Sequence, residues 1–169
     1  RQLFTLTSGL GYWFTSATLA KFKPRAGESY PVGPLLFDPG TDWLYGTNID
    51  QLGKIVEQLY GQNLEQYFRE KIFAPLGMKD TSYNVPPEKL ARLVNVHRRG
   101  PNGTGPLTEQ PRTAPAPLTR FNGGGGLAST AGDYLHFLRM LLNGGELDGA
   151  RVLSRESVAL LVQNHMGEL

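Results

Sequence analysis

Proline and glycine determine where this chain can form regular structure. Of its 169 residues, 21 are glycine and 12 are proline. The segment 99–126 contains five of the prolines: Pro101, Pro106, Pro111, Pro115 and Pro117. Proline has no N–H to donate to a β-ladder and interrupts a helix. We therefore expect a long loop at 99–126, with helices on either side, and loops of this length are usually functional or mobile.

Two segments before this loop have apolar residues at helical spacing. The first carries Ile49, Leu52, Val56 and Leu59, and the second carries Leu64, Tyr67, Phe68 and Ile72. Thr47 or Asn48 is suited to cap the first helix and Gly61 to end it, while Asn63 is suited to cap the second. The pattern predicts a helical hairpin over 47–74.

Two more helices are expected after the loop. Thr130 and Asp133 form a start resembling a capping box, and apolar residues then continue to Gly144-Gly145, which predicts a helix over 130–143. A hairpin-like connection, Gly145–Leu153, leads to a last helix over 154–163 that Ser154 can cap.

Three shorter segments also carry local signals. Arg1–Phe4 has the pattern of a helix end that the Ser8-Gly9 turn stops, and one short helix is expected near Ser16–Phe22. Leu90–Val96 fits a strand or a helix, because periodicity does not separate the two in short apolar runs.

Composition excludes several classes of function. The net charge is +2, with scattered lysines and arginines, so we expect no nucleic-acid partner. No apolar run approaches the roughly 18 residues of a membrane helix, so we expect no membrane span. The absence of cysteine excludes disulfides and thiolate metal sites, and the three histidines are far apart, so we expect no metal. The start at Arg1 has no signal-peptide pattern, and the sequence indicates no compartment.

Four short motifs occur along the chain. They are Leu6–Leu10 (LTSGL), Pro39–Gly46 (PGTDWLYG), Pro75–Thr81 (PLGMKDT) and Gly124–Ala131 (GGGLASTA). Together and in this order they resemble the serine β-lactamase-like hydrolases, with the carboxylesterases related to class C β-lactamases as the most similar branch. The resemblance implies an α/β fold of the β-lactamase/transpeptidase type, a sandwich of antiparallel sheet and covering helices joined to a mostly helical region. Residues 1–169 would form a single partial domain of this type, mainly its helical region.

The nucleophile of that family is not found in this chain. These hydrolases use S-x-x-K, which places serine and lysine on one helix face so that the amine can take the hydroxyl proton. Only Lys21 has a hydroxyl residue three positions earlier, Thr18, and this pair follows the Leu6–Leu10 motif, whereas the family's nucleophile precedes it. The sequence Gly27–Pro31 comes nearest to G-x-S-x-G but ends in proline, and K-T-G does not occur. We expect a second chain or segment to carry the S-x-x-K motif.

Tyr45 is the candidate catalytic residue that remains. In the family, the tyrosine of a Y-x-N or Y-S-x motif stands at this place and moves a proton. A phenol has a pKa near 10, so it acts as a base only where an ammonium or aimed donors favour the phenolate. The triplet here is Tyr45-Gly46-Thr47, so Thr47 or Asn48 would have to replace the amide of the family motif. The structural alternative is a half-buried Tyr45 that packs on Trp43.

Further residues are candidates for substrate binding. Tyr12, Trp13 and Trp43 are suited to line an acyl or aryl pocket, with scattered core aromatics as the equally weighted alternative. Gly124 and Gly125 would let backbone approach a substrate closely, although a simple turn before a strand fits them as well.

The resemblance implies a serine hydrolase that forms an acyl-enzyme on small esters, without a cofactor. β-Lactams, D-amino peptides and other small amides are further candidate substrates. The alternative, from a different class, is a non-catalytic module that keeps part of the fold for binding or structure.

Overall fold

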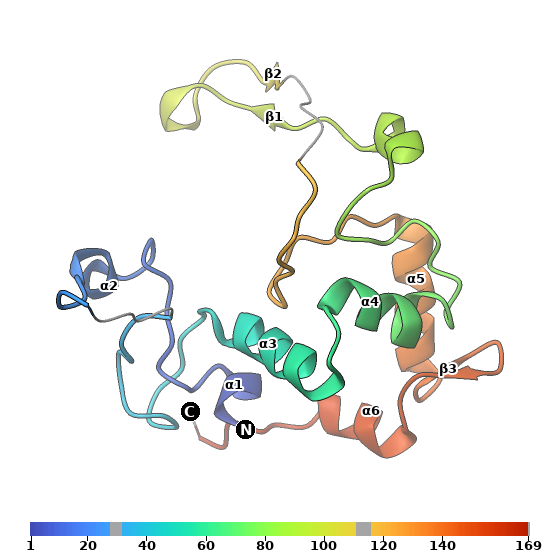
Figure 1. The fold of residues 1–169 in the computed structure, drawn as a ribbon, viewed down its shortest axis with the longest axis horizontal. Helices are drawn as coiled ribbons and strands as arrows, with labels where there is room; N and C mark the ends of the chain where they lie inside the picture. The colour runs from blue at the N-terminus through green and yellow to red at the C-terminus, as the bar shows by residue number, and fades with distance from the viewer. Residues whose placement is uncertain (28–31, 111–115, 169) are drawn as a thin grey trace.

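The computed structural model describes residues 1–27, 32–110 and 116–168. Its α-helices are α1 (Gln2–Thr5), α2 (Ala17–Lys21), α3 (Asn48–Tyr60), α4 (Leu64–Phe68), α5 (Ala131–Leu142) and α6 (Arg155–Leu161). A π-helical segment, η1 (Arg69–Phe73), and two 3₁₀ segments, η2 (Pro87–Arg92) and η3 (Pro101–Gly103), join them. The strands are β1 (His97–Arg98), β2 (Thr108–Glu109), β3 (Glu146–Leu147) and β4 (Ala150–Arg151). Figure 1 shows α3, α4, α5 and α6 grouped together, while the β1–β2 ribbon and α2 project away from them.

The first helical pair follows most of the local sequence signals, but the predicted cap of α3 is wrong, because Thr47 makes no side-chain capping hydrogen bond and Asn48 is the first residue of the helix. Helix α3 ends at Gly61, whose φ of 65° is the left-handed conformation that glycine adopts readily. The Oδ1 of Asn63 accepts a hydrogen bond of 2.9 Å from the backbone N of Gln66 and caps α4. The segment after α4 differs from the predicted α-helix, because it widens into η1, and Ala74 N donates to Arg69 O at 2.8 Å.

The second helical group also lies where it was predicted. Helix α5 begins after Thr130, whose Oγ1 accepts a 3.2 Å hydrogen bond from Asp133 N. Helix α6 begins after Ser154, whose Oγ accepts a 3.1 Å bond from Ser157 N. Between them, β3 and β4 form an antiparallel hairpin with Glu146 opposite Arg151.

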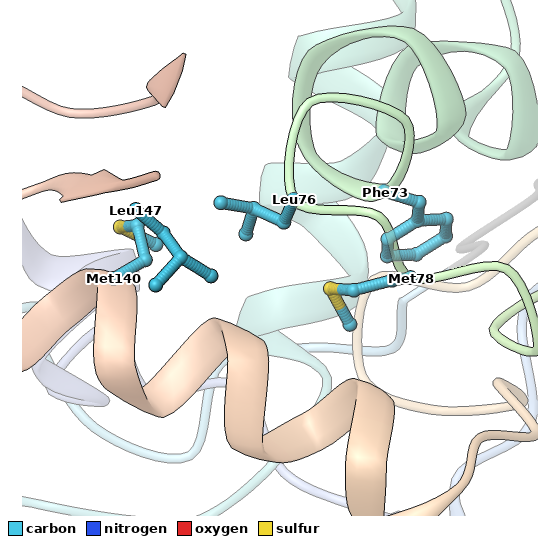
Figure 2. Packing of buried hydrophobic residues seen from close by; sticks show 5 residues of the cluster. All are labelled: Phe73, Leu76, Met78, Met140 and Leu147. Atoms are coloured by element: carbon cyan, nitrogen blue, oxygen red, sulfur yellow. The ribbon is translucent and has the colours of Figure 1, made fainter. Parts of the chain in front are cut away.

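A small apolar cluster holds these two groups together. Its buried members are Phe73, Leu76, Met78, Met140 and Leu147. Figure 2 shows Met140 and Leu147 side by side, with Leu76, Phe73 and Met78 reaching toward α5 from the other helical group. Met140 is 0% exposed, so α5 is fixed to the turn that follows η1 by burial of apolar surface.

Three predictions about local structure are corrected. Leu90–Val96 is neither one strand nor one helix: its first three residues end the 3₁₀ segment η2 at Arg92, residues 93–96 are irregular, and the strand begins only at His97. The segment 99–126 includes β2, which pairs with β1 with Arg98 opposite Thr108. A strand forms there because Thr108 and Glu109 both have a backbone N–H to donate.

The third correction concerns the start of the chain. Helix α1 ends at Thr5 and is followed by Leu6 in the left-handed conformation, so the Ser8-Gly9 turn does not stop it. Two expectations lie outside the described residues: Pro111 and Pro115 of the long loop, and residues 28–31 of the near match to G-x-S-x-G. Within the part that the structure describes, none of the helices is long and apolar enough to cross a membrane.

Candidate functional site

The turn that carries Tyr45 runs beside the Leu6–Leu10 motif. Gly40 N donates to Thr7 O at 2.7 Å, and Leu44 N donates to Leu6 O at 3.0 Å. Two motifs that are more than 30 residues apart in sequence are thus joined by their backbones. Tyr45 follows directly after this joined segment.

Gly46 fits this close approach because it lacks a side chain. A Cβ at Gly46 would lie 2.1 Å from the carbonyl oxygen of Leu10 and 2.7 Å from the Cα of Gly11. Such contacts with backbone atoms are too short for any other residue type. Glycine at position 46 therefore sets how closely the Tyr45 turn lies against the Leu10 backbone.

Tyr45 is exposed and has a second tyrosine beside it. Its side chain is 55% exposed, and its ring centroid lies 5.9 Å from that of Tyr12, with the ring planes at 52°. Burial, together with the negative charge of Asp50 and the neighbouring Tyr45, raises the pKa of Tyr12 above its ordinary value. The ring of Tyr45 therefore contacts that of Tyr12. Trp43, which the packing alternative places against Tyr45, is 46% exposed.

The aromatic candidates before Tyr45 form one run of ring contacts. Tyr12 stacks on Phe14 at 4.8 Å, and Trp13 meets Phe14 edge-on at 5.7 Å. Trp13 is 71% exposed, so it is not one of the scattered core aromatics of the alternative interpretation. Sequence reasoning did not include Phe14, although it adjoins Trp13.

Asn48 is buried, whereas Thr47 is half-buried. The hydroxyl of Ser8 donates a short hydrogen bond to Asn48 Oδ1, and Leu10 N donates to Ser8 Oγ at 3.3 Å. Asn48 is 0% exposed. Within the described residues, Asn48 Nδ2 and Thr47 Oγ1 are buried and have no hydrogen-bond partner. Direct substrate contact by either residue stays a prediction.

The glycine-rich motif comes to the same end of α3. Gly124 N donates to Asp50 Oδ1 at 3.0 Å, and Gly125 forms an antiparallel bridge with Asn122. Asp50 thereby connects this turn to the neighbourhood of Tyr12. Its position in the first turn of a helix, where an acidic side chain is favourable, was the signal that could have identified it.

The remaining two motifs contact each other beside the carboxylate of Asp133. Asp133 Oδ2 accepts hydrogen bonds from Asp80 N at 2.7 Å and from Thr81 Oγ1 at 2.8 Å. Thr81 Oγ1 also lies 2.8 Å from Ser129 Oγ. The Thr81–Ser129 contact thus links Pro75–Thr81 to Gly124–Ala131, and Asp133 links Pro75–Thr81 to α5.

A cavity of about 710 Å³ lies away from Tyr45, between η1, η2 and the strand-like residues around Ala128. Lys89 Nζ and Arg92 Nη2 lie at its wall, 2.9 and 2.8 Å from the two carboxylate oxygens of Asp80. These two partners lower the pKa of Asp80 to about 2. Asp80 therefore forms an ion-pair cluster with both cations at the wall of this cavity.

No alternative nucleophile or metal centre emerges in the described ranges. Thr18 and Lys21 are exposed on the five-residue helix α2. Across residues 1–27, 32–110 and 116–168, no group of three or more histidine, cysteine, aspartate or glutamate side chains could hold a metal ion.

Comparison with known proteins identifies the family of this chain. The family model described as beta-lactamase matches residues 1–168. A lovastatin esterase from Penicillium rubens is 34% identical over 99% of this chain, and a monacolin J acid methylbutanoyltransferase from Aspergillus terreus is 34% identical over 96% of it. The crystal structure of unliganded simvastatin synthase from Aspergillus terreus, as a selenomethionyl derivative, superposes with a TM-score of 0.78, at 32% identity over 99% of this chain.

The chain spans only part of each of these relatives. It covers 44% of the lovastatin esterase, 41% of the methylbutanoyltransferase and 42% of the simvastatin synthase chain. The structure is accordingly a part of the β-lactamase/transpeptidase-like fold in which helices predominate, as the sequence predicted. On the match of the family model and the identity to these relatives, the chain belongs to the beta-lactamase family of serine hydrolases and acyltransferases.

Proposed function

We propose that this chain is the tyrosine-bearing part of an enzyme that forms an acyl-enzyme on small esters. Tyr45 is the acid-base residue of the proposal, and the nucleophilic serine and its lysine lie outside residues 1–169. Support comes from the family match and from relatives whose names are those of an esterase and of acyltransferases. No cofactor is required for this chemistry.

The proposed reaction has two steps. The serine Oγ attacks the ester carbonyl while the phenolate oxygen of Tyr45 takes the hydroxyl proton, and the Tyr45 phenol then gives this proton to the leaving alkoxide as the C–O bond breaks. In the second step, water or an alcohol attacks the acyl-enzyme and the serine is regenerated. An ammonium beside Tyr45, from the lysine of the S-x-x-K motif, would hold the phenol as phenolate.

The observation that carries the proposal is the position of the Tyr45 side chain. Its phenol is 55% exposed at the start of α3, on a turn that Gly46 holds against Leu10. A base must reach the proton that it accepts, and an exposed ring on a turn bound to the Leu6–Leu10 backbone meets this requirement. The adjacent N-terminus of a 13-residue helix also favours negative charge at this point.

A chromogenic short-chain ester tests the proposal in a complete protein that includes the S-x-x-K segment. Tyr45→Phe should lower kcat by at least ~10²-fold, the usual scale for a positioned acid-base group. Tyr60→Phe is the matched control, because Tyr60 is 56% exposed at the other end of the same helix and pairs with Tyr67. Near-normal turnover by Tyr45→Phe would show that Tyr45 has no catalytic role.

The same assay separates the alternatives. Adding an alcohol acceptor and measuring the transferred acyl product distinguishes an acyltransferase from a hydrolase, and both activities require the same acyl-enzyme. A complete protein without turnover of any ester, β-lactam or D-amino amide would favour the non-catalytic binding module. Turnover by residues 1–169 alone would show that a nucleophile exists within them.

A further inference from the structure

Asp50 lies in the first turn of α3, shortly after Tyr45, and its carboxylate reaches a segment that is distant in sequence. Asp50 Oδ1 accepts a 3.0 Å hydrogen bond from Gly124 N, across 74 positions of the chain. Figure 1 shows the segment before α5 coming down to α3. One half-buried carboxylate thus ties the glycine-rich motif to the helix that Tyr45 precedes.

The glycine-rich turn is packed against α3 on one side and open at Gly125. A Cβ at Gly123 would lie 2.3 Å from the carbonyl oxygen of Ile49, and a Cβ at Gly124 would lie 2.9 Å from Asp50 Oδ1. A Cβ at Gly125 would meet no atom of the described residues within 4 Å. The first two glycines therefore bring the backbone onto α3, and the third leaves room beside the turn.

The charge of Asp50 also acts on the tyrosine beside Tyr45. The ring centroids of Tyr12 and Tyr45 are 5.9 Å apart, and burial, followed by the charges of Asp50 and Tyr45, raises the pKa of Tyr12. Because a Coulomb interaction weakens with distance, this effect indicates that the carboxylate is near the tyrosine pair. Asp50 therefore adjoins two sets of candidate site residues, the tyrosines and the glycine turn.

We propose that Asp50 is a positioning residue, whose carboxylate holds the turn at Gly124 at a fixed place relative to Tyr45, so that an ester bound beside Gly125 meets the phenol. This inference rests on the proposed function. A misplacement of about 1 Å can cost about 10²-fold in rate, so the place of the turn matters for kcat. Asp50 does not touch the substrate in this arrangement, and its hydrogen bond, rather than its charge, holds the turn.

The test compares Asp50→Ala with Asp50→Asn in the complete protein, with Glu156→Ala as the matched control. Alanine removes both the acceptor and the charge, whereas asparagine keeps a carbonyl oxygen for Gly124 N and removes only the charge. Glu156 is likewise an acidic residue in the first turn of a helix, α6, but it is exposed. The control therefore reports what the loss of an acidic residue from a helix start does by itself.

The two variants should differ in turnover. Asp50→Ala should lower kcat at least ~10-fold with KM little changed, because substrate still binds but is poorly aligned with the phenol. Asp50→Asn should keep kcat within about threefold of the wild type, since the acceptor survives. Glu156→Ala should leave kcat unchanged, and near-ultraviolet circular dichroism should show a folded protein in each case.

A second measurement does not depend on activity. Asp50→Ala and Asp50→Asn should both lower the pKa of Tyr12, because both remove the negative charge near its phenol. NMR of the complete protein with isotope-labelled tyrosine follows this titration, and Tyr12→Phe assigns the signal. Glu156→Ala should leave the pKa of Tyr12 unchanged.

Three results would overturn the inference. A wild-type kcat for Asp50→Ala, or a raised KM with unchanged kcat, would show that the carboxylate does not position the reacting groups. An Asp50→Asn variant as slow as Asp50→Ala would assign the effect to the charge instead of the hydrogen bond. An unchanged pKa of Tyr12 in both variants would show that Asp50 does not adjoin the tyrosines.

Gly124→Ala disturbs the same contact from the other side and takes the place of Asp50→Ala if that variant does not fold. Its Cβ would lie 2.9 Å from Asp50 Oδ1, so the turn must move and kcat should fall in the same way; an unchanged kcat would equally refute the role. Tyr45→Phe keeps the two proposals apart. A near-normal rate of Tyr45→Phe refutes the proposed function, whereas its inactivity together with a normal Asp50→Ala refutes only the role of Asp50.

Discussion

Asp133→Ala should be among the more destabilising single substitutions in this chain, because one carboxylate oxygen of α5 accepts hydrogen bonds from two groups of the Pro75–Thr81 motif. Asp133 is 8% exposed, and its Oδ2 accepts from Asp80 N at 2.7 Å and from Thr81 Oγ1 at 2.8 Å. The hydroxyl of Thr81 keeps Ser129 as a partner at 2.8 Å, so the substitution leaves Asp80 N as the one orphaned donor.

The magnitude follows from these contacts. A hydrogen bond to a charged group contributes about 1.5–3 kcal/mol, and an acidic residue in the first turn of a helix adds about 0.5 kcal/mol. We expect Asp133→Ala to lower the free energy of unfolding by about 3 kcal/mol. Asp133→Asn, which keeps one carbonyl acceptor and loses the charge, should lower it by about 1–1.5 kcal/mol.

Urea denaturation of the complete protein, followed by circular dichroism, measures both values through the shift in midpoint at constant slope. Glu156→Ala is the control, because Glu156 occupies the first turn of α6 and is exposed. It should lower the free energy of unfolding by no more than about 0.5 kcal/mol. If Asp133→Ala is no more destabilising than Glu156→Ala, the carboxylate does not hold the Pro75–Thr81 motif against α5.

Two further predictions concern other contacts. The pKa of Asp80 is lowered from 3.8 to about 2 by Arg92 and its neighbour Lys89, so the ionised form is favoured in the folded state; the added stability is present above pH 4 and is lost as the pH falls toward 2. The difference in urea midpoint between wild type and Asp80→Asn should therefore shrink over that range, and a constant difference would contradict the ion pairs. Gly46→Ala should displace the Tyr45 turn from Leu10, lower the free energy of unfolding by more than about 1 kcal/mol and lower esterase turnover. A variant with both the stability and the turnover of the wild type would show that the close approach is unimportant.

The helices could be predicted from sequence because their signals are local. Asn63, Thr130 and Ser154 cap the helices that they precede, and Gly61 ends α3, as their residue types indicate. The π-helical turns after α4 carry no such local signal, and the sequence pattern suggested an ordinary helix there.

The contacts that organise the site join residues far apart in sequence, and the periodicity of apolar residues does not predict such contacts. Ser8 and Asn48 are separated by 40 positions, and Thr81 and Asp133 by 52. The sequence identified Asp133 only as part of a helix start, whereas its carboxylate accepts hydrogen bonds from the Pro75–Thr81 motif. Tyr45 was identified through the family motif, and its catalytic role remains a prediction.

Mass spectrometry of the acyl-enzyme tests the central claim most directly. A complete protein mixed with a short-chain ester and quenched at early times should carry one acyl group on its serine, and Tyr45→Phe should acquire that group at least ~10²-fold more slowly. Equal rates of acylation in the two proteins would contradict the account, because Tyr45 would then move no proton during the attack on the ester.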